Sequence, residues 1–101
     1  MQVFYHDEVH VFIKQLQKPA QSKMLRAIEL IEQYGQYLGM PHVKKVTSVL
    51  YELRIRGKQE VRIFFIIKAG SALLLHGFVK KSQKTPQREV ETARKRIPLL
   101  T

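Results

Sequence analysis

The sequence predicts an α+β fold, and three observations support this prediction. Residues 9–16 and 24–31 carry apolar side chains at helical spacing. Residues 49–80 contain three strand-like runs of alternating side chains, separated by short turn segments. A further helical pattern follows Pro86. We therefore expect a helical hairpin packed on a small antiparallel sheet, with an N-terminal strand and a C-terminal helix.

The N-terminal third is expected to form a strand and two helices. Residues 2–5 are mostly apolar and precede a helical period that begins at His6, with two acidic residues in the first turn, where the helix dipole favours them. Pro19 either ends the first helix or opens the second, which stops near Gly35. Such a short connection predicts that the two helices lie antiparallel.

The middle of the chain is expected to form an antiparallel meander. Residues 41–48 follow a Gly-Met-Pro break and are interpreted as a loop, and three strands follow at 49–56, 60–67 and 72–80. One face of this sheet would be apolar and pack on the helices. The opposite face is expected to be uncovered and basic; it would carry Glu52, Arg54, Arg56 and Arg62.

The last helix is preceded by a polar, basic linker at residues 80–85. Pro86 suits the first helical turn, Thr85 is the expected N-cap, and Pro98 would end the helix. Its apolar stripe is narrow.

Length and composition limit the possible functions. A chain of 101 residues is expected to form one domain, residues 1–101. The absence of cysteine excludes disulfides, thiolate zinc sites and a cysteine nucleophile. No apolar run is long enough to cross a bilayer, and the N-terminus resembles no secretory leader, so we expect a cytoplasmic protein without membrane contact.

The net charge of +10 is unevenly distributed. Residues 1–40 hold four basic and four acidic side chains, so the whole excess lies in residues 41–101. This asymmetry indicates a polyanionic partner, such as nucleic acid or an acidic protein. A basic surface that serves solubility alone is the alternative.

The common catalytic motifs are missing. The sequence contains no glycine-rich phosphate loop, no GxSxG and no HExxH, so we expect no cofactor. His6 and His10 have a spacing that can bind metal, but two such residues are more often surface histidines. We therefore expect no metal site.

Arginine at strand spacing is the strongest chemical signal. Arg54 and Arg62 flank the predicted turn at 57–59 and would lie close together on one face. Two guanidinium groups aimed at one phosphate could stabilise a phosphoryl-transfer transition state. General attraction for phosphate explains the same spacing equally well.

A lysine cluster follows the third strand. Lys80, Lys81 and Lys84 lie close to Phe78, a combination that suits single-stranded RNA, although Phe78 is better explained as a core residue. His76 would share a face with Phe78 and could move a proton or be structural.

Several motifs together resemble the phage-derived branch of the RelE/HigB toxin family. They are Leu50-Tyr51-Glu52-Leu53-Arg54, Val61-Arg62-Ile63-Phe64-Phe65, Leu75-His76-Gly77-Phe78-Val79-Lys80-Lys81-Ser82-Gln83-Lys84-Thr85-Pro86, and the later Glu89, Ala93 and Arg96. The resemblance spans nearly the whole chain. It implies a RelE-like fold with a curved sheet.

The resemblance also implies a toxin of a bacterial type II toxin–antitoxin pair. Most relatives cut messenger RNA in the ribosomal A site without metal, by attack of the ribose 2′-oxygen on the adjacent phosphate. Arg54, Arg62, Lys80 and Lys81 would then be catalytic. RNA or ribosome contacts would come from Arg56, His76, Lys84, Arg88, Arg94, Lys95 and Arg96.

The implied partners are messenger RNA on the ribosome, ribosomal RNA and a cognate antitoxin of helix-turn-helix type. Operator DNA would be contacted through the antitoxin complex alone. An acidic or amphipathic antitoxin segment would lie over the basic sheet face.

The sequence departs from well-studied relatives, several of which place a tyrosine, histidine or aspartate near the C-terminus for proton transfer. Lys80, Lys81 and His76 are the candidate bases here. Two other functions stay open: a ParE-like gyrase inhibitor, and a nucleic-acid-binding accessory protein without catalysis.

Overall fold

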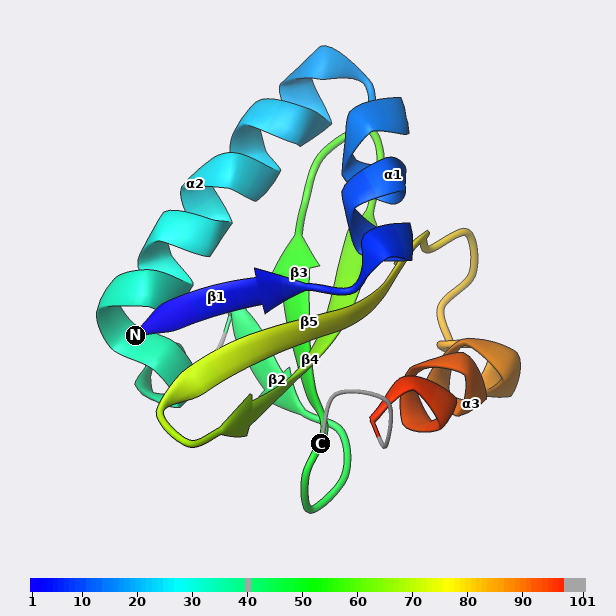
Figure 1. Cartoon of the computed structure of the whole chain (residues 1–101). Helices are drawn as coiled ribbons and strands as arrows, with labels where there is room; N and C mark the ends of the chain where they lie inside the picture. The colour runs from blue at the N-terminus through cyan, green and yellow to red at the C-terminus, as the bar shows by residue number, and fades with distance from the viewer. Residues whose placement is uncertain (40, 98–101) are drawn as a thin grey trace.

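The computed structural model describes residues 1–39 and 41–97 and has the α+β architecture that the sequence predicts (Figure 1). In chain order the elements are β1 (Gln2–Tyr5), α1 (Asp7–Gln15), α2 (Lys18–Tyr34), the 3-10 turn η1 (Gly35–Leu38), β2 (Val43–Lys45), β3 (Tyr51–Ile55), β4 (Val61–Lys68), β5 (Ser71–Val79) and α3 (Gln87–Arg96).

The strands form one sheet in the order β1-β5-β4-β3-β2. Strands β2 to β5 are antiparallel, as expected for a meander. The predicted antiparallel sheet differs at its edge, because β1 lies parallel to β5, with Val3 opposite Ala72. No tight hairpin joins these two strands, so turn geometry does not set the direction of β1.

The interpretation of residues 41–48 as a loop was wrong in part. Residues 43–45 form β2 and pair with β3, with Val43 opposite Leu53. This strand is too short to show alternation, and two of its three residues are exposed lysines. The buried side chain of Val43, which is 4% exposed, anchors it to the core.

Helices α1 and α2 cover one face of the sheet. Their stripes, which include Val9 and Met24, pack on inward-facing residues of the central strands such as Ile63 and Phe65. All four of these side chains are 0% exposed. Helix α1 approaches β5 so closely that a Cβ at Gly77 would lie 2.5 Å from the ring of Phe12. A glycine is therefore required at the point where this helix crosses the strand.

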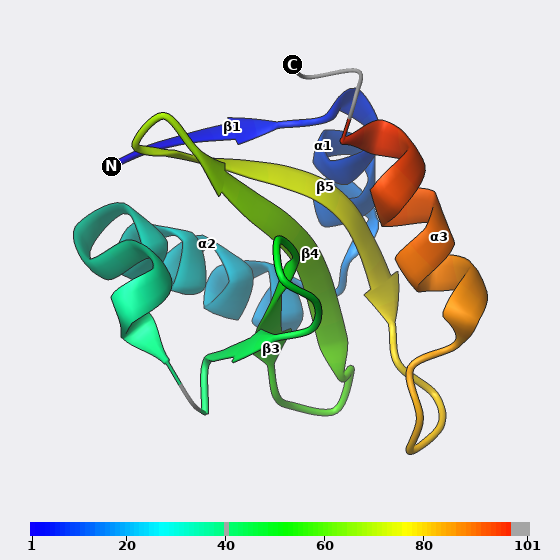
Figure 2. The same cartoon turned by 90° about the horizontal axis from the view of Figure 1, so that it is seen from below.

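The opposite face is covered in part by α3, which lies alongside β5 (Figure 2). Val90 and Ala93 of α3 pack with Phe64 and Phe78 in a second apolar cluster. The prediction that this face is uncovered was therefore wrong in part, and Phe78 is a core residue as expected. The apolar positions of α3 are few, but they meet two buried aromatic rings.

A β-bulge interrupts the alternation of β5. Phe64 lies opposite His76 and Phe65 lies opposite Leu74, so Leu75 is an extra residue on β5. Leu74 packs toward α1 and α2, whereas Leu75 packs toward α3. Beyond the bulge, His76 and Phe78 are two residues apart and lie on the same face, with a ring-centroid distance of 5.9 Å.

No helix within residues 1–39 and 41–97 is long and apolar enough to span a lipid bilayer.

Candidate functional site

The basic cleft lies where the last residues of β3 and the first residues of β4 meet the segment after β5. It has a volume of about 490 Å³. Its lining consists of Arg54, Arg56, Glu60, Arg62, Lys80, Lys81, Ser82 and Gln83. The four side chains expected to be catalytic from the resemblance therefore border one cavity.

Arg54 and Arg62 are direct cross-strand partners, which confirms that they are neighbours. Their Nε atoms lie 3.9 and 3.8 Å from the same carboxylate oxygen, Oε1 of Glu52. Because Glu52 is 5% exposed, it holds a buried negative charge between the two guanidinium groups. The two arginines are kept side by side despite their like charges.

Arg62 is enclosed by the protein. It is 2% exposed, its Nη1 donates to the Val61 carbonyl at 3.0 Å, and its Nη2 donates to Glu60 Oε1 at 3.2 Å. The expectation of an uncovered residue was therefore wrong for Arg62. A buried guanidinium is tolerated here because carboxylates and a carbonyl surround it. The Arg54 side chain, by contrast, is 15% exposed.

Glu60 is fixed by the turn between β3 and β4. The Gly57 amide donates to its Oε2 at 3.1 Å, and Arg56 Nη1 lies 3.6 Å from its Oε1. The hydrogen bond from Gly57, followed by the hydrogen bond and charge of Arg62, lowers the pKa of Glu60 below its ordinary value of 4.5. The carboxylate is thus ionised at neutral pH and orders the arginines around it.

Thr85 ties the linker to the sheet rather than to α3. Its hydroxyl donates to Glu52 Oε2 at 3.4 Å, and the N-cap of α3 is Pro86, without a side-chain capping bond. The expectation that Thr85 caps the last helix was therefore wrong. Its contact keeps the basic linker close to the cleft.

Lys80 and Lys81 enter the cleft from the end of β5. The Lys80 amide donates to the Glu60 carbonyl at 2.6 Å, which continues the β4–β5 pairing by one residue. Lys80 is half-buried and Lys81 is exposed. The backbone therefore holds Lys80 in place, while Lys81 is accessible from solvent.

His76 lies outside the basic cleft, between β5 and α3. Its Nε2 is 2.9 Å from Glu89 Oε1, and its Nδ1 is 3.4 Å from Arg96 Nη1. The same Arg96 nitrogen donates to the Leu75 carbonyl at 2.8 Å. His76 and Arg96 thus attach α3 to the sheet, away from Arg54 and Arg62.

The remaining basic candidates lie outside the cleft. Arg88 lines an adjacent hollow together with Lys81 and Phe78. Arg94 is half-exposed, and its Nη1 is 3.8 Å from Glu91. Lys84 and Lys95 are exposed on the linker and on α3.

His6 and His10, whose spacing could suit a metal ion, make contacts within the fold. His6 is the N-cap of α1, and its Nδ1 accepts a bond of 3.1 Å from the Glu8 amide. The His10 ring lies edge-on to Tyr5, with a centroid distance of 6.2 Å. Within residues 1–39 and 41–97, no three or more histidine or acidic side chains form a group that could hold a metal ion.

Sequence reasoning missed the structural role of Glu52 and Glu60. The sequence holds a signal for both roles, because each glutamate lies two residues before an arginine, and residues at this spacing share one face of a strand. Only the fold shows that both carboxylates contact the same guanidinium.

Residues 11–98 match the family model described as Phage derived protein Gp49-like (DUF891). This match covers most of the chain. The chain belongs to the Gp49-like family. This is a family of RelE/HigB-type toxins, which confirms the resemblance inferred from the sequence.

A solved structure supports the same fold. This Gp49-like chain is similar to a doubly substituted Escherichia coli toxin RelE in the free state, with a TM-score of 0.66 over 95% of this chain and 96% of that one. The sequence identity is 12%, so the likeness is one of fold. No curated protein with a matching sequence was found.

Proposed function

We propose that this protein is the toxin of a type II toxin–antitoxin pair and that it cuts messenger RNA on the ribosome. The observation that supports this function best is the cross-strand pair of Arg54 and Arg62, which shares one cleft with Lys80 and Lys81. Membership of a RelE/HigB-type family supports the same function.

In the proposed reaction, the ribose 2′-oxygen attacks the adjacent phosphorus and the bond to the 5′-oxygen breaks. The products are a 2′,3′-cyclic phosphate and a 5′-hydroxyl. Arg54, the more accessible arginine, contacts the phosphate, and buried Arg62 adds fixed positive charge behind it. Because these cations already stabilise the phosphorane-like charge, the mechanism needs no metal ion.

Proton transfer falls to the lysines in this proposal. One lysine, as the neutral amine, accepts the proton of the 2′-hydroxyl, and the other, as the ammonium, donates a proton to the departing 5′-oxygen. Lys80 is the first candidate for the base because the hydrogen bond from its amide to the Glu60 carbonyl holds it at the cleft, and Lys81 is the second.

The remaining cations bind RNA in this proposal. Arg56 lines the cleft, Lys84 follows the lining residue Gln83 in the chain, and Arg88, Arg94 and Lys95 extend the positive surface along α3. His76 and Arg96 contribute by positioning α3. A cognate antitoxin, expected to be of helix-turn-helix type, neutralises the toxin, and operator DNA is contacted through that complex.

The test is induced expression in bacteria followed by primer extension on a translated message. Arg54→Ala should reduce cleavage by about 100- to 1,000-fold, since it removes a group that stabilises the transition state. Lys14→Ala is the matched control, because it removes one exposed positive charge from α1. Cuts at in-frame codons that depend on translation and on Arg54 are the expected result.

Other outcomes would point elsewhere. Growth arrest without cuts would favour a ParE-like inhibitor of gyrase. No arrest and no cuts, with RNA binding that falls smoothly with salt, would favour a non-catalytic accessory protein. Equal cleavage by both variants would remove Arg54 from the mechanism.

A further inference from the structure

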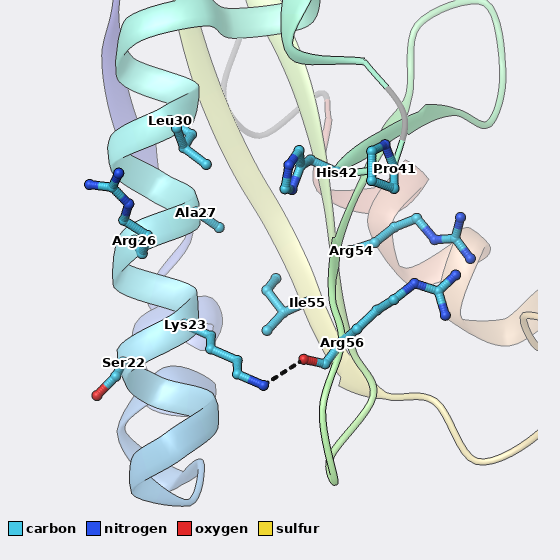
Figure 3. Close-up of a pocket in the computed structure, with 10 residues that line it drawn as sticks. All are labelled: Ser22, Lys23, Arg26, Ala27, Leu30, Pro41, His42, Arg54, Ile55 and Arg56. Carbon is cyan, nitrogen blue, oxygen red and sulfur yellow. Dashed lines mark hydrogen bonds between the residues drawn. The ribbon is translucent and has the colours of Figure 1, made fainter.

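A second cavity, the α2–β3 groove, lies between helix α2 and the edge of the sheet and has a volume of about 460 Å³ (Figure 3). Its inner surface is aliphatic. Ala27 and Leu30 point from α2 toward Ile55 of β3 across the groove. Ala27 and Ile55 are 7% and 4% exposed, and Leu30 is half-buried.

The charged residues of this groove are all basic. Lys23, Arg54 and Arg56 line it, together with His42, and none of its lining residues is acidic. Lys23 Nζ donates to the Arg56 carbonyl at 2.9 Å, which closes one end of the groove (Figure 3). Arg26 also belongs to the lining, but its guanidinium is turned away and binds Glu29. An anionic occupant is therefore favoured.

The aliphatic lining favours a peptide over RNA. Bases of single-stranded RNA stack on aromatic rings or guanidinium planes. The lining contains no phenylalanine, tyrosine or tryptophan, the ring of His42 is its one aromatic group, and its inner wall is aliphatic. Aliphatic pockets suit leucine, isoleucine or valine side chains of an extended or helical segment. Carboxylates on the same segment would pair with the basic rim.

We propose that the α2–β3 groove binds an acidic, amphipathic segment of the protein that neutralises the toxin. The segment inserts aliphatic side chains between Leu30 and Ile55 and places carboxylates at Lys23, Arg54 and Arg56. This identifies a docking surface on the helix side of β3, distinct from the sheet face that the charge pattern alone suggested.

The groove and the basic cleft share two residues. Arg54 and Arg56 line both cavities, and their guanidinium groups extend away from α2 (Figure 3). A carboxylate that engages these groups competes with an RNA phosphate for the same charge. The partner thereby weakens RNA binding without reaching Lys80 or Lys81, an effect that rests on the proposed function.

The first experiment measures peptide binding by fluorescence anisotropy. The probe is a labelled peptide in which leucine alternates with glutamate, and a leucine–lysine peptide is its control. Leu30→Glu should weaken binding of the acidic peptide by about tenfold or more. Leu25→Glu adds the same charge to an α2 position that is 52% exposed and outside the groove, so it should bind like the wild type.

Lys23→Glu, at an exposed side chain, gives a second variant in case Leu30→Glu folds poorly. It should also weaken binding about tenfold, because a rim cation becomes an anion. Equal affinity of both peptides, no binding of the acidic peptide, or equal binding by Lys23→Glu and Leu25→Glu would overturn the proposal.

The second experiment is competition between the acidic peptide and a single-stranded RNA oligonucleotide. The peptide should displace RNA from the wild-type protein, and displacement should need about tenfold more peptide with Lys23→Glu. Unchanged RNA affinity at saturating peptide would show that the peptide and RNA do not compete for Arg54 and Arg56. Groove-dependent peptide binding by a protein that neither binds nor cuts RNA would refute the nuclease function and leave the docking surface standing.

Discussion

On the sheet face toward α1 and α2, the buried residues are apolar and come from both helices and from strands β2 to β5. On the face toward α3, a smaller apolar cluster around Phe64 and Phe78 gives way to buried Glu52 and Arg62. The first face supplies hydrophobic stabilisation over a large area. On the second face, buried charged groups occupy part of the area, and each of them needs a partner of opposite charge. Replacing apolar burial with paired charges is common at functional sites.

Loss of a large side chain from the first face should have the largest effect. Phe65 is 0% exposed and stacks on Tyr51 with a centroid distance of 5.4 Å. Phe65→Ala should lower the free energy of unfolding by about 3–5 kcal/mol, measured by urea denaturation. Phe4→Ala is the control because Phe4 is 51% exposed. Similar losses in both variants would contradict the assignment of the main core to this face.

On the second face, stability should depend on charge matching. Arg62→Ala leaves Glu52 and Glu60 without their shared partner and should cost about 3 kcal/mol in unfolding experiments. Arg62→Met combined with Glu60→Gln should recover part of that loss, because one unmatched carboxylate is removed and Glu52 still pairs with Arg54. A cost below about 1 kcal/mol for Arg62→Ala would mean that the ion pairs of Arg62 with Glu52 and Glu60 do not stabilise the fold.

The burial of Arg62 affects how a toxicity assay of Arg62→Ala would be interpreted. Lost toxicity in Arg62→Ala would combine lost chemistry with lost stability, since Arg62 is 2% exposed. Arg54 is the better position for testing catalysis because its side chain is 15% exposed.

The smallest expected effect is a pH dependence. The pKa of Glu60 is lowered in the folded protein, so its ionised form stabilises the fold above pH 4.5, and this stabilisation is lost as pH falls through the lowered pKa. Glu60→Gln should therefore cost less than about 1 kcal/mol at pH 7, because the side chain is one-third exposed. In urea titrations, the difference from wild type should shrink as the pH falls below 4.5 and through the lowered pKa of Glu60. A difference that grew on acidification would contradict the assignment.

Periodicity predicted most of the fold. Helical spacing located α1 and α2, and alternation located β3 and β4, because each of these elements buries one stripe or face. Strand β2 was missed because three residues with two exposed lysines carry no period. The bulge at Leu75 could not be predicted from the sequence either, because it depends on how β5 pairs with β4 and not on a local residue pattern.

The site was predictable in its members but not in its burial. Strand spacing placed Arg54 beside Arg62, and the motif after β5 placed the lysines near them. Alternation assigns a residue to a face but does not show what covers that face. The enclosure of Arg62 depends on Glu60 from a turn and on Glu52, which Thr85 of a distant linker contacts.

The contacts of His76 favour one tautomer of its neutral ring. Arginine can only donate, so the bond from Arg96 requires a lone pair on Nδ1. The proton of the neutral ring then resides on Nε2 and points at Glu89. In this tautomer both nitrogens are engaged within the protein, and neither lone pair is left to deprotonate a ribose hydroxyl. In the proposed nuclease reaction, this leaves Lys80 and Lys81 as the candidate bases.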